Sequence, residues 1–213
     1  LSLHDALPIF LVVLFYAIYL VVRNGVISYQ KASGLAMFSG IVIFCFYSFI
    51  RLKEMLPVEE YGYDAIFFIL LILCFAWGGD TCAYFAGRAF GKHKLCPVVS
   101  PKKTVEGAVG GVLGTMVFGV LITVIYSIAA DRMEEFTRSN IGVSMYVIIA
   151  LLACVAAVLG IYGDLFASVV KRQCGIKDYG TIFPGHGGIL DRFDSVMFIA
   201  PFVTMVVIAA FYD

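Results

Sequence analysis

The stretch VSMYVIIALLACVAAVLGIY, residues 143–162, runs for 20 residues without a charged side chain. A helix needs about 20 mostly apolar residues to cross the hydrocarbon core of a bilayer. The stretch therefore predicts a membrane-spanning helix. It leads directly into the polar sequence GDLFASVVKRQCGIKD, residues 163–178, so the helix is expected to end in a polar region.

The composition of the whole chain agrees with a membrane location. Of its 213 residues, 62% are hydrophobic and 14% are charged, whereas soluble domains have about half and a quarter. Five more apolar runs are candidate spans: 7–22, 34–50, 65–79, 105–130 and 196–212. We predict an all-α, polytopic integral membrane protein with about six transmembrane helices. The formal net charge is zero, so we expect no nucleic-acid partner.

The positive charges predict the orientation of the chain, because Lys and Arg concentrate in cytoplasmic loops. With alternating spans, both long polar stretches, 80–104 and 163–195, fall on the side with more positive charge. We therefore expect a multi-pass protein of the cell inner (plasma) membrane, with both stretches as cytoplasmic catalytic segments of a single domain, 1–213. Eleven of the 15 Lys and Arg residues lie on that side: Arg23, Lys31, Arg88, Lys92, Lys94, Lys102, Lys103, Lys171, Arg172, Lys177 and Arg192.

The first eight residues differ in character from the apolar run after them. The segment LSLHDALP, residues 1–8, has no initiator methionine and does not blend into that run. We interpret it as a foreign or artefactual leader, and the chain as truncated at its N-terminus.

Acidic and basic side chains follow the span at 143–162. If the helix continues past Gly163, then Asp164, Ser168 and Lys171 share one face, with Arg172 at its margin. Two interpretations stay open: a structural ion pair where the helix leaves the bilayer, or a metal ligand beside phosphate-binding cations. Acidic groups near a membrane are functional candidates because they are costly to bury there.

A second polar cluster, GTIFPGHGGILDRFDS, occupies residues 180–195. Its glycines allow backbone amides to approach a ligand closely, and a helix beginning there would offer free N–H groups to phosphate. Its acids, Asp191 and Asp194, are either partners of the helix dipole or ligands of Mg²⁺, which prefers carboxylate, water and phosphate oxygens. With Asp164 on a neighbouring helix, Mg²⁺ is the better interpretation. His186 is a local hydrogen-bonding group or a donor to phosphate.

Two features flank the start of the span at 105–130. In SPKKT, Lys102 and Lys103 either bind phosphates as point charges or only keep this end of the span in the cytoplasm. The run VEGAVGGVLG contains two overlapping G-x-x-x-G patterns, which predict close helix packing without a ligand.

Together these residues resemble the signature of the phosphatidate cytidylyltransferase (CDP-diacylglycerol synthase) family. The resemblance covers roughly residue 70 to the C-terminus, and members of the family usually have more N-terminal transmembrane helices than this chain. The signature runs through Ser168, Lys171, Arg172, Lys177, Asp178, Gly180, Pro184, His186, Gly187, Gly188, Asp191, Arg192 and Asp194.

The resemblance implies an activity in phospholipid biosynthesis, in which CTP and phosphatidic acid give CDP-diacylglycerol and pyrophosphate. It implies Mg²⁺, with K⁺ as a candidate second ion, and a homodimer. The implied metal ligands are Asp164 and Asp191, with Asp194 as a further candidate. The implied catalytic residues are Asp164, Asp191, Lys171, Arg172 and His186, and the implied substrate-binding residues are Lys102, Lys103, Ser168, Lys177, Arg192, Gly187, Gly188 and Asp80.

Two other functions stay open. A CTP-dependent membrane polyprenol or lipid kinase would use similar residues, but it would release CDP instead of pyrophosphate. A transporter would place its charges at mid-bilayer on broken helices, whereas here the charges cluster at one predicted interface.

Overall fold

The computed structural model describes residues 11, 14–19, 21–22, 29–132, 142–180 and 187–212. The chain forms two compact units, Leu1–Phe44 and Cys45–Asp213, which we describe separately. In the first unit, the described residues are helical and include the beginning of helix α2 (Tyr29–Met55), which continues into the second. The predicted single domain stays a prediction.

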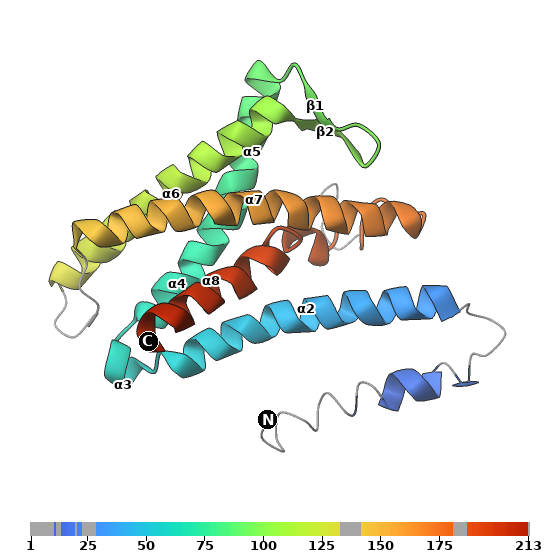
Figure 1. The fold of residues 1–213 in the computed structure, drawn as a ribbon, viewed down its shortest axis with the longest axis horizontal. Coiled ribbons are helices and arrows are strands. Elements are labelled where there is room, and N and C mark those ends of the chain that lie inside the picture. The colour runs from blue at the N-terminus through green and yellow to red at the C-terminus, as the bar shows by residue number, and fades with distance from the viewer. Residues whose placement is uncertain are drawn as a thin grey trace. The chain divides into compact units, whose positions relative to one another are not determined.

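The second unit is mostly helical and contains one β-hairpin (Figure 1). Its two strands pair antiparallel, with Lys94 opposite Thr104 and Cys96 opposite Ser100. The hairpin projects beyond the ends of α5 and α6 (Figure 1). After α2 the elements are α3 (Val58–Tyr61), α4 (Asp64–Leu73), the π-helix η1 (Cys74–Gly78), α5 (Gly79–Phe90), β1 (Lys94–Cys96), β2 (Ser100–Thr104), α6 (Val105–Arg132), α7 (Val143–Gln173), the 3₁₀-helix η2 (Leu190–Arg192) and α8 (Val196–Tyr212).

Among the described residues, four helices are long and apolar enough to cross a membrane. They cover Ala36–Met55, Asp64–Phe90, Val105–Arg132 and Val143–Gln173, and Val196–Phe211 is a shorter apolar helix. The chain is thus a mostly helical, polytopic membrane protein. Most of the predicted span 7–22 lies outside the described residues.

The structure corrects two predictions about the polar stretch 80–104. The helix expected to end near residue 79 continues through η1 and α5 to Phe90. Residues 94–104, expected within an all-α chain, form the β-hairpin instead. The polar residues Asp80, Thr81 and Arg88 interrupt the apolar run and hid the helix in the sequence, and all three are exposed in the structure.

Helices α5 and α6 pack closely through the glycines of the VEGAVGGVLG run. A Cβ added at Gly110 would overlap the side chain of Ala86, and one added at Gly114 would overlap Cys82. Small residues let two helix backbones approach in this way. The predicted close helix packing is confirmed, and the partner helix is α5 of the same chain.

The base of the hairpin is fixed to the first turn of α6. The Thr104 hydroxyl accepts a hydrogen bond from the Gly107 N–H at 3.1 Å, which caps the helix. The Glu106 carboxylate accepts the N–H groups of Lys92 and His93 and lies 2.6 Å from the His93 ring nitrogen Nδ1. These contacts set the direction in which β2 presents its side chains.

Candidate functional site

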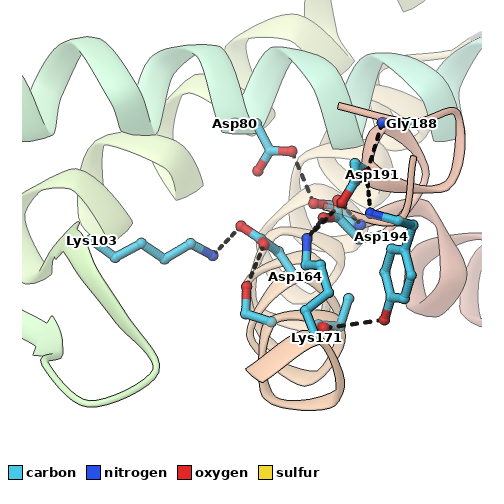
Figure 2. A network of polar contacts seen from close by, with 11 residues as sticks. Asp80, Lys103, Asp164, Lys171, Gly188, Asp191 and Asp194 are labelled. Atoms are coloured by element: carbon cyan, nitrogen blue, oxygen red, sulfur yellow. Dashed lines mark hydrogen bonds and ion pairs between the residues drawn. The ribbon is translucent and has the colours of Figure 1, made fainter. Parts of the chain in front are cut away.

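Four aspartates and two lysines from distant parts of the chain gather in one place (Figure 2). Asp80 comes from α5, Asp164 and Lys171 from α7, and Lys103 from β2. Asp191 lies on η2 and Asp194 just before α8. The two polar stretches of the sequence therefore contribute to the same cluster, which we call the carboxylate–lysine cluster.

Asp191 is held by three donors. Its Oδ1 accepts from the Lys171 ammonium at 2.8 Å, and its Oδ2 accepts the backbone N–H groups of Gly188 at 2.9 Å and Tyr179 at 2.8 Å. Gly187 has a φ of +81°, a conformation that side chains disfavour. A Cβ there would also lie 3.1 Å from the Asp191 carboxylate. The paired glycines thus make room for this acid.

The pKa of Asp191 reflects these contacts. Burial acts to raise the pKa, but the hydrogen bonds from Lys171, Gly188 and Tyr179 outweigh it and hold the pKa of Asp191 below its ordinary value. Asp191 is therefore ionised at neutral pH.

Lys171 is buried, with 7% of its surface exposed. Its ammonium lies 3.9 Å from Asp194 as well as 2.8 Å from Asp191. The same ammonium lies 5.2 Å from the centroid of the Tyr179 ring, a cation–π distance. The Tyr179 hydroxyl donates to the Ala167 carbonyl on α7 at 3.2 Å. These contacts fix the lysine between two carboxylates.

Asp164 pairs with a lysine from the hairpin. Its Oδ2 lies 2.5 Å from the Lys103 ammonium, and Ser168 one turn later donates to Oδ1 at 3.4 Å. Neighbouring residues of a strand point to opposite sides, so Lys102 is exposed while Lys103 faces the cluster. The lysine pair that the sequence presented as one unit is therefore divided between two environments.

Ser195 connects the two remaining acids. Its hydroxyl donates to Asp80 at 2.9 Å, and its backbone N–H donates to the Asp194 carboxylate at 2.9 Å. Burial first, and then the negative charge of Asp164, raise the pKa of Asp194 to about 7, although Lys171 opposes the shift. A positive charge added near Asp194 would therefore stabilise its ionised form.

The cluster suits a divalent cation by its chemistry but not by its present arrangement. Among the described residues, no three Asp, Glu, His or Cys side chains converge as a ready metal site, and lysine ammonium groups contact the carboxylates instead. Four carboxylates against two lysines leave a formal charge of −2 when all are ionised. Such oxygen donors are those that Mg²⁺ prefers, so the residues present fit this ion once the lysines move.

The remaining predicted site residues are exposed or lie beyond the described part of the chain. Lys102, Arg172, Lys177 and Arg192 are exposed. The Arg192 carbonyl accepts a hydrogen bond from the Trp77 indole at 3.0 Å. His186, together with Pro184, lies outside the described residues.

Two residues that contact the carboxylate–lysine cluster, Ser195 and Tyr179, were given no role in the sequence analysis. Ser195 directly follows the D-R-x-D motif, and this adjacency was the available signal. Tyr179 lies between two motif positions, Asp178 and Gly180, and nothing in the sequence marks it, because its contribution is a backbone N–H and a ring beneath a lysine.

The fold and the cluster define a polytopic membrane protein with an acidic, lysine-lined site among its helices. Residues 3–210 match the cytidylyltransferase family, and the chain belongs to that family.

Named relatives support this assignment. The phosphatidate cytidylyltransferase of Bacillus subtilis strain 168 is 32% identical over 191 residues, which cover 90% of this chain and 64% of that protein. The phosphatidate cytidylyltransferase of Staphylococcus saprophyticus is 41% identical over 145 residues, covering 68% of this chain and 50% of that protein. The chain thus spans between half and about two thirds of the length of these relatives.

Proposed function

We propose that this chain carries the catalytic part of a phosphatidate cytidylyltransferase, which converts CTP and phosphatidic acid into CDP-diacylglycerol and pyrophosphate. Family membership supports the proposal, as do the names of the relatives. The observation that carries it in the structure is the pairing of Lys103 with Asp164, which joins both polar stretches in one charged site beside the membrane spans.

The reaction needs positioning and charge neutralisation more than proton transfer. A phosphate oxygen of phosphatidic acid attacks the α-phosphorus of CTP and forms a new P–O bond. The bond from that phosphorus to the β-phosphate oxygen breaks, and pyrophosphate leaves with the electron pair. Phosphatidic acid is already an anion at neutral pH, so no general base is required. Lys103 and Lys171 are the cluster residues that neutralise phosphate charge.

The aspartates of the cluster are the proposed holders of Mg²⁺. Asp164 and Asp191 are the first candidates for its ligands, and Asp194 and Asp80 are further candidates. K⁺ is a candidate for a second ion. When bound, Mg²⁺ would neutralise charge on the phosphate oxygens and orient them. Lys103 and Lys171 would then exchange their carboxylate partners for substrate phosphates. The exposed Lys102, Arg172, Lys177 and Arg192 are proposed to contact the outer phosphates or the headgroup.

The membrane arrangement extends the proposal. We infer a multi-pass protein of the inner (plasma) membrane with about six spans and the cluster on the cytoplasmic side. The excess of Lys and Arg in both polar stretches supports this orientation. A homodimer is expected from the family resemblance alone.

Product analysis separates this proposal from a CTP-dependent lipid kinase. Purified protein in detergent would receive CTP, phosphatidic acid and Mg²⁺, and both the nucleotide and the lipid products would be identified by mass. We expect CDP-diacylglycerol and pyrophosphate in equal amounts. Free CDP with a phosphorylated lipid would show a kinase and refute the proposal.

A further inference from the structure

The turn of the β1–β2 hairpin presents an apolar tip. Val98 is 93% exposed, the highest value among the large hydrophobic residues of the described chain. It lies in the sequence CPVVS, between exposed Pro97 and half-buried Val99. A valine with so little protein contact at the end of a projecting hairpin gains nothing from the fold itself.

The hairpin is the connection between two of the candidate membrane spans. It joins the apolar helix that ends at Phe90 to the apolar helix that begins at Val105. Phe90 is 70% exposed and Val105 is 42% exposed, as expected for apolar residues at the ends of spans that face lipid. If both helices span the bilayer, the hairpin that joins them lies beside the membrane surface.

The charge of the hairpin has a single sign. Residues 91–104 contain no acid, and Lys92, Lys94 and Lys102 are all exposed. Lys103 is already paired with Asp164 in the carboxylate–lysine cluster. An exposed apolar tip beside lysines complements an anionic lipid surface, where acyl chains receive the tip and headgroup phosphates receive the ammonium groups.

We propose that the β1–β2 hairpin docks on the anionic lipid surface next to the site, with Val98 entering the boundary of the acyl chains. The exposed lysines of the hairpin contact headgroup phosphates, and their stems extend along the interface. Nucleotide binding would account for the lysines, but it would give no reason for the apolar tip. Because Lys103 belongs to the same hairpin, the docked hairpin also fixes this lysine over Asp164.

Fluorescence quenching by brominated lipids tests the docking directly. Val98→Trp and Lys94→Trp proteins would be reconstituted in phosphatidylglycerol-containing vesicles, with the wild-type protein as the blank for Trp77. Bromine on the acyl chains should quench the indole of Val98→Trp severalfold more than that of Lys94→Trp, because only the tip enters the acyl boundary. Equal quenching at the wild-type level, with access to an aqueous quencher at both positions, would overturn the proposal.

A second arm tests the charge. In the Val98→Trp background, Lys92→Gln with Lys102→Gln should remove the extra quenching that anionic vesicles give over zwitterionic ones. A matching melting temperature shows that the variant is folded. If quenching follows added CTP and ignores the lipid charge, the lysines serve the nucleotide and the docking proposal is wrong. Neither arm needs turnover, so failure here is distinct from failure of the proposed activity.

Discussion

Replacing Lys171 by methionine separates two roles of the aspartates in the cluster. One is the ion pair with Lys171, and the other is the proposed binding of Mg²⁺. Methionine fills the space of the lysine stem but removes the ammonium group. Asp191 then loses its 2.8 Å partner and Asp194 its 3.9 Å partner. Two carboxylates are left in a site that also contains Asp164.

The magnitude depends on the burial of the pair. The side chains of Lys171 and Asp191 are 9% and 8% exposed, and removing one partner of a buried ion pair costs about 3 kcal/mol or somewhat more. For a protein of this size, about 3 kcal/mol lowers the melting temperature by roughly 6–12 °C. In the variant Mg²⁺ no longer competes with the ammonium, and at 100 times its Kd the ion restores about 2.7 kcal/mol.

Thermal melting of the detergent-solubilised protein measures both effects, with the fluorescence of Trp77 as the signal. We expect Lys171→Met to melt well below the wild type in a chelator and to regain most of the difference in Mg²⁺. Lys53→Met, at an exposed lysine near the end of α2, is the matched control and should change stability by less than about 1 kcal/mol.

Two results would refute this reasoning. If Lys171→Met melts like the wild type in the chelator, the buried pair does not stabilise the fold. If Mg²⁺ raises both melting temperatures equally, the lysine does not stand where the ion binds.

Three further predictions concern packing, capping and the site. Gly110→Ala should lose about 1–3 kcal/mol of stability because its methyl group would overlap α5. Gly40→Ala is the control: a Cβ there would have nothing within 4 Å, so the variant should gain about 0.5–1 kcal/mol. Equal melting temperatures of the two variants would contradict this prediction. Thr104→Ala should lose about 1 kcal/mol through the missing cap of α6, and Thr104→Ser should recover it in the same melting assay. Ser195→Ala removes the hydroxyl that orients Asp80 at 2.9 Å, so we expect kcat/KM for CTP to fall roughly tenfold; an unchanged value would show that this contact is only structural.

The sequence predicts the helices well because the bilayer allows few alternatives. Backbone groups in hydrocarbon must be paired within the helix, so long apolar runs become spans. The periodicity of α7 also placed Asp164, Ser168 and Lys171 on one face, and in the structure Ser168 donates to Asp164 while Lys171 contacts Asp191. These side-chain positions follow from the 3.6-residue repeat alone.

The hairpin and the partners of the lysines could not be predicted in the same way. Strands as short as β1 and β2 depend on a register that the contacts around Glu106 fix. The different environments of Lys102 and Lys103 follow from that register. The extension of the third span to Phe90 was missed because exposed polar residues, Asp80, Thr81 and Arg88, interrupt the apolar run within the helix.

The most direct test of the proposed activity measures pyrophosphate release from CTP by the purified protein, with phosphatidic acid and Mg²⁺ each present or omitted. We predict release that needs both components and is lost in Asp191→Asn, while Asp131→Asn, at an exposed acid near the end of α6, retains it. Release without phosphatidic acid, or full Mg²⁺-dependent release by Asp191→Asn, would contradict the proposed function and its metal site.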